Sequence, residues 1–174
     1  MRIHFTKTGA DFGPDERMLS LSQTTGYAIK ALACLNKPKC RSRSTPQIAA
    51  CAGVPQPYLA KVLRQLAARG LVTARRGLGG GVSLTRPPEQ ITLLQIVQAV
   101  EGPDWIGDCL LGLDECSDQT TCPTHDFWRR IRGEITDELS RTTLAAVIHF
   151  RNLNRKVAKA KPRLSRAQAI CPTC

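Results

Sequence analysis

The chain has 174 residues, of which 42% are hydrophobic, and a formal net charge of +11. This length allows one domain of ordinary size plus an appendage. No run of 18 or more apolar residues is present, so no segment is expected to span a membrane. Residues 1–17 lack the apolar core of a signal peptide, and we therefore expect a cytoplasmic protein whose thiols stay reduced.

The charges are sorted along the chain. Residues 17–86 contain twelve Lys or Arg and no Asp or Glu, whereas residues 87–128 contain eight Asp or Glu and no Lys or Arg. Residues 129–174 contain eleven basic and three acidic residues. A long segment with many basic residues and no carboxylate is the electrostatic footprint of a protein that binds a polyanion. The alternative is a generically basic, solvated surface.

Two short helices open the organised part of the chain. The first is expected to be capped by Thr24 or Thr25 and to end at Leu35. The second begins after Ser44, has a proline in its first turn, and ends at Gly53. Residues 1–17 precede them as an extension to which we assign no role.

A third helix with apolar residues at helical spacing continues to Gly70. The second and third helices, joined by a tight glycine-containing turn, predict a helix-turn-helix. Its second helix, called the recognition helix, meets the edges of DNA bases. Tyr58 could instead pack against the protein. The predicted DNA contacts of the helical part are Thr24, Gln56, Pro57, Tyr58, Lys61 and Arg64.

Two β-prone triplets, 71–73 and 82–84, flank a glycine-rich tip and predict a hairpin. Paired arginines at its base suit a wing that reaches phosphates or a minor groove. A nucleotide-binding phosphate loop is disfavoured because the tip lacks the G-x-x-x-x-G-K-[ST] pattern. The predicted contacts of the wing are Arg75, Arg76, Gly77, Gly79 and Gly80.

After a short amphipathic helix predicted over residues 92–101, three cysteines and a histidine fall within seventeen residues, spaced C-x6-C-x5-C-x2-H. Thiolates are preferred ligands of iron–sulfur clusters and zinc, and the surrounding loop is rich in turn formers. The intervals between the cysteines are wider than those of common zinc motifs, so an iron–sulfur cluster is the favoured interpretation. Structural zinc and unligated thiols are the alternatives. The predicted metal ligands are Cys109, Cys116, Cys122 and His125.

Beyond this loop, apolar residues recur at three- and four-residue steps from Trp128 to Phe150, with an expected break near residues 140–143. This one-sided stripe predicts a long dimerisation helix in a homodimer that binds two half-sites of double-stranded DNA. Cys34 and Cys51 are expected to be small core residues. The expected units are an N-terminal extension (1–17), a winged helix-turn-helix domain (18–102), a cluster-binding loop (103–125), a dimerisation region (126–154) and a disordered basic tail (155–174).

These segments together resemble the winged helix-turn-helix regulators of the IscR and NsrR family. The residues that carry the resemblance are LSQTTGYAIKAL, IAACAGVPQPYLAKVLRQLAARGLV, RRGLGGGVSL, ITLLQIVQAVEG, the three cysteines and CPTHDFWRRI. The resemblance implies a mainly α fold with a small β-wing, and a 2Fe–2S cluster on the three cysteines and His125. The first cysteine interval is one residue longer than the IscR pattern, and Ala60 stands where that pattern has an acidic residue.

The sequence thus predicts a DNA-binding transcriptional regulator, not an enzyme, whose operator affinity depends on an iron–sulfur cluster that senses iron–sulfur status or oxidative stress. One alternative is a nitric-oxide-sensitive repressor of the NsrR type with a 4Fe–4S cluster. Another is a cluster-free regulator that uses the thiols directly or binds zinc. Oxygen or nitric oxide would be the small-molecule signal. An electron-transfer enzyme is disfavoured because the chain has no flavin or nucleotide motif.

Overall fold

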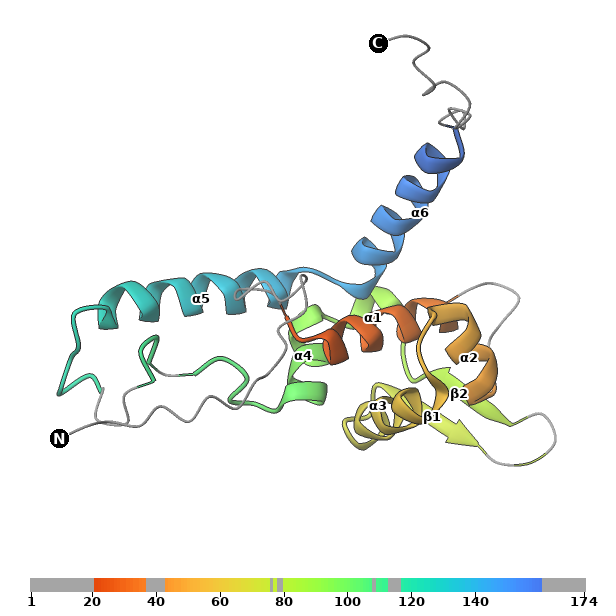
Figure 1. Ribbon diagram of the computed structural model, residues 1–174, viewed down its shortest axis with the longest axis horizontal. Helices are drawn as coiled ribbons and strands as arrows, with labels where there is room; N and C mark the ends of the chain where they lie inside the picture. The colour runs from red at the N-terminus through yellow and green to blue at the C-terminus, as the bar shows by residue number, and fades with distance from the viewer. Residues whose placement is uncertain are drawn as a thin grey trace, which may run out of the picture.

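The structure is a computed structural model that describes residues 21–36, 43–75, 77, 80–107, 109–112 and 117–160. In these ranges the protein is mainly helical, with one two-stranded antiparallel sheet (Figure 1). Four helices and the hairpin form a winged helix-turn-helix domain, from which the last two helices extend in different directions. The predicted fold class is confirmed. None of the described helices has the length and apolar content needed to cross a membrane.

Helices α1 (Gln23–Leu35), α2 (Thr45–Ala52) and α3 (Gln56–Ala68) build the first half of this domain. The N-cap of α1 is Ser22, whose hydroxyl accepts a hydrogen bond from the Thr25 amide at 3.2 Å. The prediction of Thr24 or Thr25 as the cap was therefore wrong. Thr25 lies inside the first turn and is fully buried, and its hydroxyl donates to a tertiary partner described below instead of capping the helix.

The second helix begins and ends as its sequence predicts. Ser44 and Gln47 form a capping box, in which each side chain accepts a hydrogen bond from the other residue's backbone amide. Gly53 ends α2 in the left-handed conformation, at φ 66°, where a residue with a β-carbon would be strained. The tight turn that follows sets α3 across α2, as a helix-turn-helix requires.

The wing consists of β1 (Val72–Arg75) and β2 (Gly81–Leu84), paired antiparallel from Val72 with Leu84 to Arg75 with Gly81. The hairpin prediction is confirmed. Arg43 adds an isolated bridge to it: the Arg43 amide donates to the Val82 carbonyl at 3.1 Å, and the Val82 amide donates to the Arg43 carbonyl at 2.8 Å. The residues just before α2 are thereby fixed to the wing.

A single apolar core lies between these elements and α4 (Leu93–Glu101), which matches the predicted range. A short 3-10 turn, η1 (Pro88–Gln90), precedes α4. Cys34 is buried in this core, as predicted, but Cys51 is only half-buried, and the two are joined in a disulfide between α1 and α2. Both cysteines therefore pack in or against the core, as expected, and the disulfide, with Cα atoms 6.2 Å apart, was not anticipated from the sequence.

Helices α5 (His125–Arg141) and α6 (Leu144–Ala160) are separated at Thr142 and Thr143, where the sequence predicts a break. The break is anchored on the winged domain by two backbone hydrogen bonds. The amide of Leu144 donates to the Ile91 carbonyl at 2.8 Å, and the amide of Leu93 donates to the Thr142 carbonyl at 2.9 Å. The Leu144 side chain is completely buried in the core, so it attaches both helices to the domain.

The C-terminal boundary differs from the expectation. Helix α6 continues to Ala160, so a disordered tail does not begin at residue 155. Lys, Arg and Ala favour helices, and the next helix breaker in the sequence is Pro162. Residues 1–17 and the C-x-x-C at Cys171 and Cys174 lie outside the described residues.

Truncating the Leu144 side chain tests whether this anchor stabilises the fold. Leu144→Ala is expected to lower the free energy of unfolding by about 2–5 kcal/mol, because it leaves a cavity in the core. Urea denaturation measures the change. Leu111→Ala, at a side chain that is 54% exposed, is the matched control and should change stability by less than about 0.5 kcal/mol. Equal effects of the two substitutions would contradict the anchoring role.

Candidate nucleic-acid interface and metal-binding loop

Helix α3 divides into a buried and an exposed face. Its apolar face, which includes Leu59 and Leu66, is fully buried in the core. The opposite face is open to solvent and carries all the side chains predicted to contact DNA from this helix: Gln56, Pro57, Tyr58, Lys61 and Arg64. The geometry therefore leaves this face available to a groove of DNA, while the contacts themselves stay predictions.

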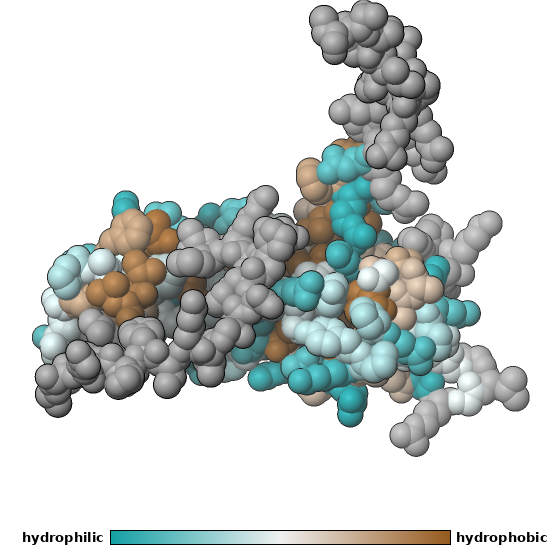
Figure 2. Space-filling model, viewed as in Figure 1, coloured by the Kyte–Doolittle hydropathy of each residue, from teal (hydrophilic) through white to brown (hydrophobic). Residues whose placement is uncertain are grey.

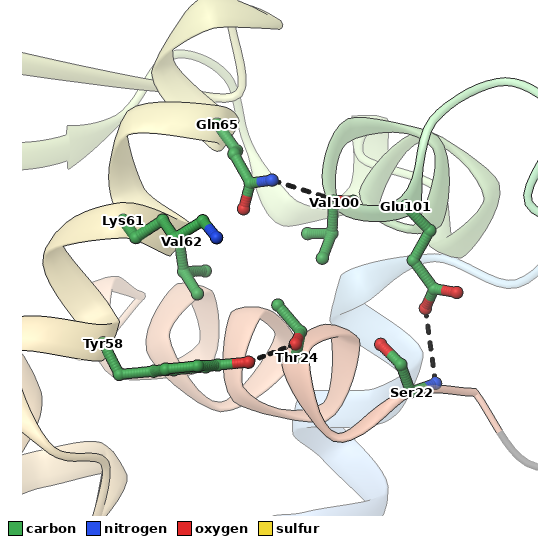
Figure 3. Close-up of a pocket in the computed structure, with 8 residues that line it drawn as sticks. All are labelled: Ser22, Thr24, Tyr58, Lys61, Val62, Gln65, Val100 and Glu101. Carbon is green, nitrogen blue, oxygen red and sulfur yellow. Dashed lines mark hydrogen bonds between the residues drawn. The ribbon is translucent and has the colours of Figure 1, made fainter. Parts of the chain in front are cut away.

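Tyr58 is both packed and exposed. Its side chain is 40% exposed, and its hydroxyl is hydrogen-bonded to the Thr24 hydroxyl (Figure 3). The ring of Tyr27 meets it edge-on, with centroids 5.5 Å apart and planes at 84°, a favoured aromatic geometry. Lys30 Nζ lies 5.5 Å from the centroid of Tyr27. The structure thus brings Thr24 and Tyr58 together and fixes the orientation of the tyrosine.

In the wing, Arg75 is exposed at the end of β1. Gly77 has φ 94°, which requires glycine, and its carbonyl accepts a hydrogen bond from the Gly80 amide at 2.9 Å. Arg76 and Gly79 lie outside the described residues. Arg75 is therefore exposed to solvent where the first strand of the wing ends.

Sequence reasoning missed the junction that holds α3 to α1 and α4 (Figure 3). Glu101, the last residue of α4, accepts hydrogen bonds through Oε1 from the Ser22 amide at 3.3 Å and from the Thr25 hydroxyl. Gln65 Nε2 of α3 donates to the Val100 carbonyl at 3.2 Å. A cleft of about 240 Å³ lies between the three helices and is lined by Ser22, Thr24, Tyr58, Lys61, Val62, Gln65, Val100 and Glu101.

The loop between α4 and α5 carries the predicted metal ligands. Cys109 and Cys122 are half-buried, and the Cys122 sulfur lies 3.4 Å from the Thr124 hydroxyl oxygen. Cys116 lies outside the described residues. Among the residues that are described, no three His, Cys, Asp or Glu side chains gather closely enough to hold a metal ion. The donor chemistry, thiols with an imidazole, nevertheless fits an iron–sulfur or zinc centre.

His125 begins α5 and is held by a carboxylate that the sequence did not single out. Its Nε2 lies 3.0 Å from Asp118 Oδ1, and Arg129 approaches the same oxygen at 3.5 Å. The hydrogen bond from His125, followed by the positive charge of Arg129, lowers the pKa of the Asp118 carboxyl below its ordinary value. Trp128 Nε1 donates to the Gly107 carbonyl at 2.7 Å. Both ends of the loop are thus fastened to α5.

Comparisons with known proteins agree with this architecture. The Rrf2 family model, described as an iron-dependent transcriptional regulator, matches residues 21–149. A protein of Aquifex aeolicus described as an HTH-type transcriptional regulator is 33% identical over 131 residues, which cover 74% of this chain and 91% of that protein.

Two solved structures are similar in fold. CymR (YrzC), the global cysteine regulator of B. subtilis, superimposes with a TM-score of 0.60 at 27% identity, covering 76% of this chain and 98% of that one. IscR of T. potens superimposes with a TM-score of 0.59 at 25% identity, covering 82% of this chain and 92% of that one.

Removing the Thr25 hydroxyl tests the junction. Thr25→Val keeps the shape of the side chain but deletes the donor to Glu101, and should lower the free energy of unfolding by about 1–2 kcal/mol. Thr121→Val, at an exposed loop position, is the control with little expected change. A double-mutant cycle with Glu101→Ala should show coupling between residues 25 and 101, and purely additive effects would speak against the hydrogen bond.

Replacing an arginine of the wing tests phosphate contact. Arg75→Ala should weaken DNA binding and reduce the slope of log K against log salt by about 0.9, the value for one lost phosphate contact. Arg141→Ala is the charge-matched control, since Arg141 lies on α5 and pairs with Asp137. Fluorescence anisotropy over a salt series measures both. If the two variants had the same slope, Arg75 would not contact phosphate.

Proposed function

Because the chain belongs to the Rrf2 family of iron-dependent transcriptional regulators, we propose that an iron–sulfur cluster controls its affinity for a DNA operator. The family itself makes the protein a DNA-binding transcriptional regulator and not an enzyme. The proposal adds the cluster, with 2Fe–2S favoured, and the signal, which is iron–sulfur status or oxidative stress. It rests chiefly on the placement of two predicted ligands, Cys109 and Cys122, in the loop whose Gly107 carbonyl and Asp118 side chain are held by α5.

The residues that would hold the cluster are Cys109, Cys116, Cys122 and His125. When bound, an iron–sulfur cluster would link these donors to one centre that oxygen or nitric oxide can degrade. Asp118 would act on His125, since a carboxylate on the second ring nitrogen commonly orients a ligating imidazole. Its 3.0 Å contact with Nε2 supports this role.

The loop follows the end of α4, which is hydrogen-bonded to both α1 and α3. Val100 accepts a hydrogen bond from Gln65 of α3, and Glu101 accepts hydrogen bonds at the start of α1. The loop ends at α5, whose break from α6 is anchored on the domain by Leu144. A loop tied together at Cys109 and Cys122 would therefore hold α4 and α5 in one arrangement, and a released loop would not. Such a two-state element is what a ligand must bias to act as a switch.

A second copy of the chain is the proposed partner of α5 and α6. Helix α5 has no buried residue within the single chain, although its sequence is amphipathic. Phe127, Phe150 and Leu153 are 50%, 62% and 46% exposed. Figure 2 shows apolar surface at the outer end of α5 and along α6. A homodimer through these helices would place two recognition helices on two half-sites of double-stranded DNA.

Deleting one thiol tests the cluster directly. Cys122→Ala should lose iron and sulfide and change operator affinity at least tenfold relative to the loaded wild type. Native mass spectrometry of protein purified without oxygen counts iron and sulfide per chain. Thr121→Ala, next to it in the loop, should keep both the cluster and the affinity.

The stoichiometry separates the alternatives. Two irons and two sulfides per chain support the proposal with His125 as fourth ligand. Four of each, lost on exposure to nitric oxide, would replace it with a nitric-oxide-sensitive repressor. Bare protein or one zinc per chain would replace it with a cluster-free regulator. Equal operator affinity with and without the cluster would overturn the sensor role.

A further inference from the structure

A second pair of cysteines lies in the DNA-binding domain, away from the cysteine loop. Cys34 of α1 and Cys51 of α2 are seventeen residues apart in sequence and form a disulfide, with Cα atoms 6.2 Å apart. That Cα separation is within the range that a disulfide spans without movement of the backbone. Cys34 is 3% exposed, whereas Cys51 is half-buried at the edge of the core. The proposed cluster uses neither residue.

We propose that Cys34 and Cys51 are a reversible thiol–disulfide site, oxidised by hydroperoxides, that crosslinks α1 to α2 and stabilises the DNA-binding domain. This site is separate from the cluster loop and would operate whether or not a cluster is bound. It gives the protein a second response to oxidants, one that preserves the helix-turn-helix.

The difference in exposure sets the order of the reaction. The Cys51 thiolate, which solvent reaches, attacks one peroxide oxygen; the O–O bond breaks and leaves a sulfenic acid and an alkoxide or hydroxide, which takes up the proton lost by Cys51 and leaves as alcohol or water. The Cys34 thiolate then attacks the Cys51 sulfur and displaces hydroxide, which takes up the proton lost by Cys34 and leaves as water. In sum, two thiols and one hydroperoxide give a disulfide, an alcohol and water, and the peroxide accepts the two electrons.

The crosslink acts where the domain depends most on packing. Helix α2 has only eight residues, too few to be stable alone, and it buries Ile48 and Ala49 against its neighbours. It is also the first helix of the helix-turn-helix and supports α3. A bond from α2 to α1 removes chain entropy from the unfolded state, so the oxidised domain should resist unfolding more than the reduced one.

Peptide mapping of the full-length protein tests the site. The protein is reduced, treated with hydrogen peroxide, alkylated at its remaining thiols and digested with trypsin. Cleavage after Lys30 and Lys39, and after Arg43 and Lys61, gives two peptides with one cysteine each, 31–39 and 44–61. They should appear joined in the oxidised sample and separate in the reduced one.

Thermal unfolding supplies the second readout. Oxidation should raise Tm by about 10 °C, the shift expected for a loop of this length in a chain of this size. Cys51→Ser should abolish both the joined peptide and the rise in Tm. Cys40→Ser, at a cysteine that lies between the two in sequence, should keep both, which separates this pair from the thiol at residue 40. Cys34→Ala is a second variant in case the serine at position 51 disturbs folding.

Each outcome decides the proposal. Joined peptides with a rise in Tm that both Cys34→Ala and Cys51→Ser remove would support it. Absence of the joined peptide after peroxide treatment, or its formation without a rise in Tm, would overturn it. Comparing the variants with the wild type under the same oxidant removes any contribution from cluster damage, since the cluster ligands are unchanged. The proposed cluster can therefore fail its own test without affecting this one.

Discussion

The carboxylate of Glu101 joins the end of α4 to the beginning of α1. It accepts hydrogen bonds from the Ser22 amide and from the hydroxyl of Thr25, a side chain that is completely buried. A buried hydroxyl without an acceptor costs about 1–3 kcal/mol, so α1 depends on this contact. Gly102 follows as the C-cap of α4, and the cysteine loop begins after it. The residue that supports α1 therefore lies two positions before the proposed sensor.

This arrangement also gives the charge distribution a structural meaning. Residues 17–86 contain no Asp or Glu, so α1, α2, α3 and the wing carry no carboxylate that would repel DNA. In α1, the buried Thr25 hydroxyl needs a hydrogen-bond acceptor. Glu101, the last residue of α4 and part of the acidic segment, supplies it. The Glu101 carboxylate thus joins α4 to α1, while the exposed face of α3 carries Lys61 and Arg64.

The break between α5 and α6 has a comparable role for the second half of the molecule. A single unbroken helix spanning α5 and α6 would have carried all its apolar side chains along one face. At Thr142 and Thr143 the backbone instead pairs with the residues around Ile91, and Leu144 enters the core. The two helices therefore leave the domain in different directions (Figure 1), with apolar side chains of both exposed.

The sequence by itself determined the elements, because their signals are local: the box at Ser44 and Gln47, the glycine at 53, the hairpin around 72–84 and the break near 142. It also determined the class of DNA-binding protein and the residue types of the loop. Only the tertiary structure decided the contacts between distant segments. Nothing local to Thr25 indicates Glu101, nothing near Cys34 indicates Cys51, and Asp118 meets His125 only because the loop turns back on α5. Helix periodicity shows which face is buried, but the partner on that face depends on how the helices cross.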